Sequence, residues 1–147
     1  MKTTGIMKSD KGRILFVEDE KLLLDMYHDF FERNGYDFLS TGDIKEAMTV
    51  TQFEKPDVIM LDIIIPKPEN TVAEQGYEFL ETVKKNPLTK DVPVIVFTNL
   101  NTEKDREKSR QMGAAAYIFK KDTIPRRVLE TVAEIIEQHR KKGKIRH

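Results

Sequence analysis

The chain has 147 residues, 39% of them hydrophobic and 34% charged, so it is the size of one compact domain with enough apolar residues for a core. Its 25 basic and 25 acidic residues balance, which removes any global electrostatic case for binding nucleic acid or an anionic membrane. The absence of cysteine excludes disulfides, thiolate metal sites and thiol nucleophiles. Because the N-terminus is polar and no apolar run is longer than a strand, we expect a cytoplasmic protein.

Within the chain, short apolar runs alternate with amphipathic helical patterns. Most of the runs are continuous, as in strands that a parallel sheet buries on both faces, whereas the second alternates as at a sheet edge. In chain order, the sequence predicts a strand at 14–17, a helix at 21–35, a strand at 36–40, a helix at 43–55, a strand at 58–61, a helix at 76–87, a strand at 92–97, a helix at 102–113, a strand at 115–119 and a helix at 124–140. This alternation implies right-handed crossovers and an α/β sandwich of three layers.

Two of the predicted helices differ in how firmly they should pack on the sheet. The fourth has a capping pair, Thr102 and Asp105, but Met112 is its only apolar residue, so we expect a weak attachment. The first has an apolar face that we expect to lie inward, formed by Leu23, Met26, Tyr27 and Phe30.

Polar side chains follow four of the predicted strands, at the point where each strand ends. Glu18 and Asp19 follow the first strand, Asp62 the third, Thr98 the fourth and Lys120 the fifth. Since ligands of open α/β sheets bind at the carboxyl ends of the strands, we expect these groups to share one rim. Three converging carboxylates require a cation, and oxygen ligands suit Mg²⁺ or Mn²⁺.

Each of these groups also has a simpler structural interpretation. The acidic pair can cap a loop or helix, Thr98 can act as a capping hydroxyl, and Lys120, next to Lys121, can be a solvated charge. Their occurrence together, in order, at successive strand ends favours a shared site.

This combination resembles the receiver domain of bacterial and archaeal response regulators, over the segment from about Arg13 to about His139. The resemblance is carried by "VEDE" after the first strand, "PDVIMLDIIIP" around the third, "PVIVFT" at the fourth and "GAAAYIFKK" at the fifth. It implies a flavodoxin-like (βα)5 fold, with a parallel five-stranded sheet of order 2-1-3-4-5. We expect the receiver domain at 13–140, a flexible extension at 1–12 and a basic tail at 141–147.

The resemblance also implies a role for each site residue. Asp62 would be the phosphoacceptor, Thr98 and Lys120 would stabilise the phosphoryl group, and Thr98 with Tyr117 would form the switch. From the apolar character of Ile64 and Leu100 we expect these side chains to exclude water and to slow hydrolysis of the phosphoryl group. The Mg²⁺ ligands would be Glu18, Asp19, Asp62 and the backbone carbonyl of Ile64.

Two features depart from the family pattern. Lys121 stands where a proline is common, so the loop after Lys120 lacks the backbone constraint that a proline imposes. The segment "KPENTVAEQ" at 67–75 makes the connection after the third strand longer than usual, next to the predicted phosphorylation pocket.

We therefore expect a stand-alone, phosphorylation-dependent switch that catalyses only its own phosphorylation and slow dephosphorylation. Its partners would be a histidine kinase or histidine phosphotransfer protein and a downstream protein that reads the surface formed by the fourth helix, fifth strand and fifth helix. We expect no direct DNA binding, and a monomer or weak homodimer.

The residues leave two alternative functions open. A phosphatase of the haloacid dehalogenase type also uses a strand-end Asp and Mg²⁺, but it would want a second acid where Ile64 stands. A receiver-like binding module that signals without phosphate would keep the fold, although the intact set of polar groups argues against it.

Overall fold

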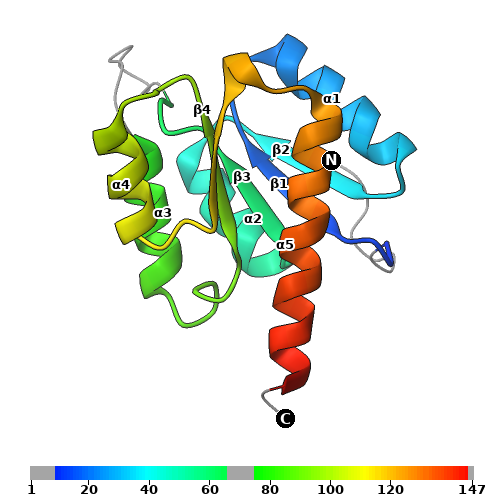
Figure 1. Cartoon of the computed structure of the whole chain (residues 1–147). Helices are drawn as coiled ribbons and strands as arrows, with labels where there is room; N and C mark the ends of the chain where they lie inside the picture. Colours follow the sequence, from blue (N-terminus) through cyan, green and yellow to red (C-terminus); the bar gives the residue numbers. More distant parts are fainter. Residues whose placement is uncertain (1–8, 66–74, 146–147) are drawn as a thin grey trace.

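The computed structural model describes residues 9–65 and 75–145, which form a five-stranded sheet between two layers of helices (Figure 1). The strands are β1 (Arg13–Val17), β2 (Asp37–Thr41), β3 (Val58–Leu61), β4 (Val94–Thr98) and β5 (Ala116–Phe119). The helices are α1 (Lys21–Arg33), α2 (Ile44–Glu54), α3 (Gln75–Lys85), α4 (Glu103–Gln111) and α5 (Pro125–Ile145), with a 3₁₀ turn, η1 (Lys120–Asp122), after β5.

All neighbouring strands are parallel and their order is β2-β1-β3-β4-β5. The predicted fold class and strand order are therefore confirmed. Helix α5 continues to Ile145, so residues 141–145 of the expected tail are helical. The expected extension is described only from Ser9 onward, and the 67–75 segment lies outside the described residues except for Gln75, which begins α3. No described helix is long and apolar enough to cross a membrane.

The sheet buries a separate apolar cluster on each face. Residues of β1 alternate between the two faces, so that Leu15 packs with α2 and α3 while Phe16 packs with α1 and α5. In α1 the inward face differs from the prediction: Tyr27 and Phe31 are buried, whereas Met26 is 48% exposed. Leu23, Tyr27 and Phe30 of the predicted face do pack on this cluster, so the prediction was wrong only for Met26 and missed Leu24 and Phe31.

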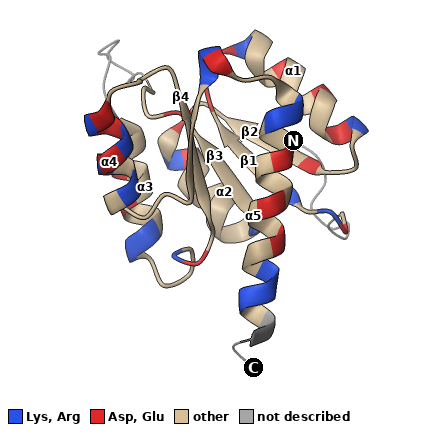
Figure 2. Cartoon of the chain, in the orientation of Figure 1, with Lys and Arg blue, Asp and Glu red and all other residues tan. Residues whose placement is uncertain are grey.

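Helix α4 is the most polar of the five helices. Ser109 is its only buried residue, and charged side chains cover most of its length (Figure 2). Thr102 caps the helix by accepting a hydrogen bond from Asp105 N–H at 3.0 Å, as predicted. A helix that buries so little apolar surface depends on polar contacts for its position.

Candidate functional site

The register of the sheet places two acidic residues next to each other. Val17 of β1 pairs with Leu61 of β3, so Glu18 and Asp62 leave the sheet side by side. On the other side of β3, β4 and β5 are paired up to the last residue of each strand, and Lys120 follows directly. These three side chains therefore meet at the carboxyl edge of the sheet.

Lys120 joins the two acids in a buried ion pair. Its Nζ lies 2.5 Å from Glu18 Oε1 and 2.6 Å from Asp62 Oδ2. Glu18 is 1% exposed and Asp62 is 6% exposed, so the pair is shielded from bulk water. The ammonium is also 5.8 Å from the centre of the Phe97 ring. Two carboxylates and one cation leave a net negative site.

Burial and pairing shift the protonation of this cluster in different ways. Burial raises the pKa of Glu18, and the hydrogen bond and charge of Lys120 only partly oppose that effect. Burial acts to lower the pKa of Lys120, but its hydrogen bonds to Asp62 and Glu18, together with the negative charges of these acids, outweigh burial and raise that pKa. The lysine is therefore held as the charged ammonium.

Asp19 lies apart from the cluster. Its side chain is exposed, while its backbone N–H donates to Glu18 Oε2 at 3.1 Å, as does the N–H of Glu20. Within residues 9–65 and 75–145, no three Asp, Glu or His side chains are gathered closely enough to hold a metal ion. In the structure Lys120 contacts Glu18 and Asp62, and Asp19 does not take part in this ion pair.

Thr98 and Tyr117 both contact the backbone of Leu100. Thr98 is fully buried, and its Oγ1 accepts a hydrogen bond from Leu100 N–H at 3.4 Å. The Tyr117 hydroxyl donates to Leu100 O, and the guanidinium of Arg106 lies 4.9 Å from the Tyr117 ring centre. The loop after β4 is thus held by the two residues assigned to the switch.

The loop that follows Asp62 is fixed against the start of α3. Asp62 Oδ1 accepts a hydrogen bond from Ile64 N–H at 3.1 Å, and Gly76 N–H donates to Ile63 O at 2.9 Å. A Cβ on Gly76 would lie 2.4 Å from Ile63 Cα and 2.6 Å from Asp62 O, so only glycine fits here.

Sequence reasoning placed Gly76 at the start of the predicted helix at 76–87 and gave Tyr77 no role beyond that helix. The signal for Gly76 was a glycine at the beginning of a helical pattern, where nearly any other residue is more favourable. The sequence held no signal that the Tyr77 hydroxyl would bond to Asp105 of α4, at 2.8 Å. Two residues belong to the departures from the family pattern. Lys121 is exposed within η1. Gln75, the last residue of the 67–75 segment, donates a hydrogen bond from Nε2 to Ile65 O at 3.1 Å.

Residues 14–133 match the family described as the Response regulator receiver domain. The chain belongs to this family. Receiver domains are parts of two-component signalling systems, they typically bind Mg²⁺, and a histidine kinase is the partner that they imply.

Known receiver proteins match most of the chain. The polar-differentiation response regulator DivK of Brucella anthropi is 31% identical over 119 residues, which are 81% of this chain and 91% of that protein. A CheY-like receiver domain protein from Methanospirillum hungatei has a TM-score of 0.78 at 29% identity, and the match covers 89% of this chain and 98% of that one. The N-terminal receiver domain of Klebsiella pneumoniae RstA shares the fold, with a TM-score of 0.71 at 24% identity over 84% of this chain and 97% of that one.

Proposed function

We propose that this receiver domain is a switch in which Asp62 accepts a phosphoryl group from a phosphohistidine of a partner kinase or phosphotransfer protein. The observation that carries the proposal is the position of Lys120, whose Nζ lies 2.6 Å from Asp62 Oδ2 at the carboxyl edge of the sheet. A carboxylate is a poor nucleophile toward an anionic phosphoryl group unless nearby cations offset the charge. Lys120 is the cation that this chain supplies.

The transfer step conserves atoms and charge. A carboxylate oxygen of Asp62 forms a bond to phosphorus as the P–N bond of the phosphohistidine breaks, and the donor leaves as a neutral imidazole because its other ring nitrogen carries a proton at transfer. Asp62 Oδ1 stays oriented by the Ile64 N–H, so the nucleophile is positioned by backbone as well as by Lys120. The Lys120 ammonium then pairs with the new phosphoryl oxygens.

The oxygen groups at this edge have the chemistry that a hard divalent cation such as Mg²⁺ prefers, and Asp19 would have to turn toward Glu18 and Asp62 to complete a site. Glu18 and Asp62 are buried carboxylates, and Asp19 is the adjacent exposed one, so their chemistry suits oxygen-preferring ions rather than soft metals. These three residues and the backbone carbonyl of Ile64 would hold the ion. When bound, it neutralises charge on the phosphoryl group during transfer.

The signal would pass from Asp62 to the α4-β5-α5 surface through the loop after β4. The Thr98 hydroxyl accepts from Leu100 and keeps its own proton to donate to a phosphoryl oxygen. The Tyr117 hydroxyl donates to the carbonyl oxygen of the same residue, Leu100, and Tyr117 lines a cavity of about 260 Å³ between α4 and β5, together with Arg106 and Arg110. A movement of Leu100 would therefore change the shape of a surface that a downstream protein can bind.

Incubation with acetyl phosphate and Mg²⁺ tests the proposal. The wild-type chain should take up one phosphate that is stable to acid and labile to base, and Asp62→Asn should abolish uptake. Asp91→Asn is the matched control, because Asp91 is exposed at the opposite edge of the sheet. Uptake that persists in Asp62→Asn would refute the assignment. Continuous release of phosphate would instead support a phosphatase, and no reaction with any phosphodonor would support a binding module.

A further inference from the structure

We infer that the Tyr77 hydroxyl is a positioning group that fixes helix α4 relative to the phosphoacceptor loop. The observation is a side-chain hydrogen bond between two helices: the hydroxyl donates to Asp105 Oδ1 at 2.8 Å. Tyr77 is in the first turn of α3, and Asp105 is in the first turn of α4. The role of this contact in signalling rests on the proposed function, whereas the positioning of α4 does not.

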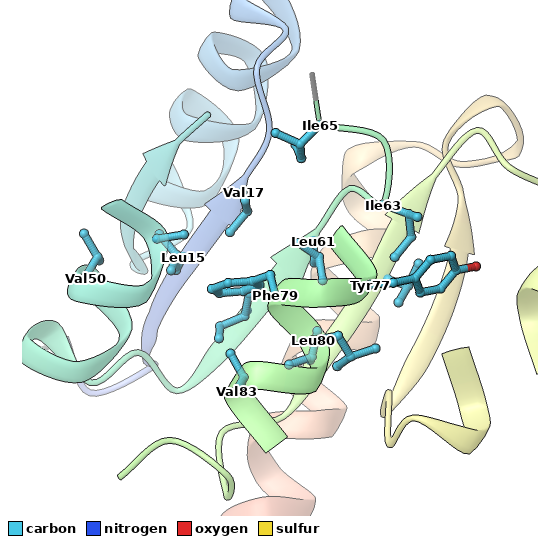
Figure 3. Close-up of a cluster of buried hydrophobic side chains, with 14 of the residues drawn as sticks. Leu15, Val17, Val50, Leu61, Ile63, Ile65, Tyr77, Phe79, Leu80 and Val83 are labelled. Carbon is cyan, nitrogen blue, oxygen red and sulfur yellow. The ribbon is translucent and has the colours of Figure 1, made fainter. Parts of the chain in front are cut away.

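Tyr77 is held firmly enough to act as a fixed point. Its side chain is 5% exposed and belongs to the apolar cluster that contains Leu61 and Leu80. In Figure 3 the Tyr77 ring extends from α3 at one side of the cluster, and its hydroxyl oxygen points away from Leu61 and Leu80. The Lys108 ammonium of α4 lies 4.0 Å from the ring centre, which adds a cation–π contact to the same helix.

Asp105 also takes part in the cap at the start of α4. Its other oxygen, Oδ2, accepts from the Thr102 hydroxyl at 2.6 Å, and its N–H donates back to Thr102 Oγ1. The carboxylate that receives the Tyr77 hydroxyl is therefore part of the cap that starts the helix. Since Ser109 is the only residue of α4 that is buried, few apolar contacts compete with this polar one.

Residues next to Tyr77 and Asp105 contact the loops of the proposed switch. On the α3 side, Gly76 N–H donates to Ile63 O, in the residue next to Asp62. On the α4 side, Arg106 donates to Asn101 Oδ1 at 2.7 Å and lies over Tyr117. The Tyr77–Asp105 hydrogen bond thus closes a second connection between the phosphoacceptor loop and the loop after β4, separate from the Thr98 hydroxyl.

A buried tyrosine also needs a hydrogen-bond partner for purely structural reasons, so the test must separate positioning from general stability. Tyr77→Phe keeps the ring and the Lys108 contact and removes only the hydroxyl. Amide hydrogen exchange of the unphosphorylated protein should become about tenfold faster in residues 102–111, because a hydrogen bond to a charged group is lost. Exchange in residues 125–136 of α5 should stay unchanged.

Tyr36→Phe is the matched control, because it removes the hydroxyl of another buried tyrosine near the amino edge of the sheet, and it should leave residues 102–111 unchanged. In an Asp105→Ala background, Tyr77→Phe should have no further effect on α4 exchange. The inference is overturned by unchanged exchange in α4, by an equal increase in α4 and α5, or by additive effects of the two substitutions.

The signalling role has its own readout. Tyr77→Phe should take up phosphate from acetyl phosphate as the wild type does, but the resulting change in α4 exchange should be smaller. An undiminished change in α4 would overturn that role. If the wild type took up no phosphate, the proposed function would fail, while exchange in the unphosphorylated protein would still decide the positioning of α4.

Discussion

Glu18 and Asp62 share one ammonium group, that of Lys120, whose Nζ lies 2.5 Å from Glu18 Oε1 and 2.6 Å from Asp62 Oδ2. The two acids come from neighbouring strands and are both buried, so they would repel each other strongly without this cation. The lysine that we assign to phosphoryl binding therefore also stabilises the protein before any phosphoryl group arrives.

Removing that charge should destabilise the fold. Lys120→Met keeps most of the side-chain volume but leaves two buried acids without their cation, so the free energy of unfolding should fall by about 2 kcal/mol or more. Urea denaturation at neutral pH measures the change. The neighbouring Lys121 is exposed, and Lys121→Met should stay within about 0.5 kcal/mol of the wild type. Equal stability of the two variants would show that the ion pair contributes little.

The raised pKa of Glu18 predicts a specific pH dependence of stability. Because burial raises this pKa in the folded state, the folded protein binds a proton at Glu18 more readily than the unfolded chain does. The stability that Glu18 contributes is complete below the unfolded pKa of about 4.5 and is lost as pH rises through the higher folded value.

Comparison with Glu18→Gln isolates this effect. The unfolding free energy of the wild type minus that of the variant should decrease as pH rises above 4.5, in urea titrations at several pH values. Glu20→Gln, at an exposed carboxyl two residues away, is the matched control for removal of one acidic charge from this loop. A constant or rising difference for Glu18→Gln would contradict the prediction.

Gly76 should not tolerate even a methyl group. Gly76→Ala would place a Cβ 2.4 Å from Ile63 Cα, and backbone atoms cannot yield as a flexible side chain can. We expect a loss of about 1–3 kcal/mol in unfolding free energy, as for overpacked sites. Gly143 in α5 has no atom within 4 Å of its Cβ position, so Gly143→Ala should instead stabilise by about 0.5–1 kcal/mol. Denaturant unfolding of both variants checks the opposite signs.

The apolar residues near Asp62 should control how long the phosphoryl group lasts. Ile64 and Leu100 are both partly buried, and Leu100 packs against an apolar cluster. Replacing Leu100 with asparagine should admit and orient water and speed hydrolysis by roughly tenfold, which corresponds to about 1.4 kcal/mol of barrier. Release of labelled phosphate after removal of the donor measures the rate. A wild-type half-life of only seconds, or an unchanged rate in the variant, would argue against this role.

The strands, the sheet order and the position of the site were predictable because each depends on patterns that are local in sequence. Asp62 and Lys120 are 58 residues apart, yet each ends an apolar run, and parallel strands bring such ends together. Which of the three acids pair with Lys120 was not predictable, since that depends on where the long lysine side chain extends in the folded protein. The Tyr77–Asp105 contact was also hidden, because it joins two side chains 28 residues apart whose separate patterns indicate only a core position and a helix cap.

The end of α5 lies far from the phosphoacceptor, where Arg140 donates to Asp10 O ahead of the first strand. Since the chain has no cysteine of its own, a Lys141→Cys substitution would create a unique attachment point on this distal edge. The Lys141 side chain is 69% exposed, so a fluorophore or a surface linker there would leave the opposite rim accessible to a kinase. The molecule can therefore be immobilised or labelled with its reactive edge facing solution.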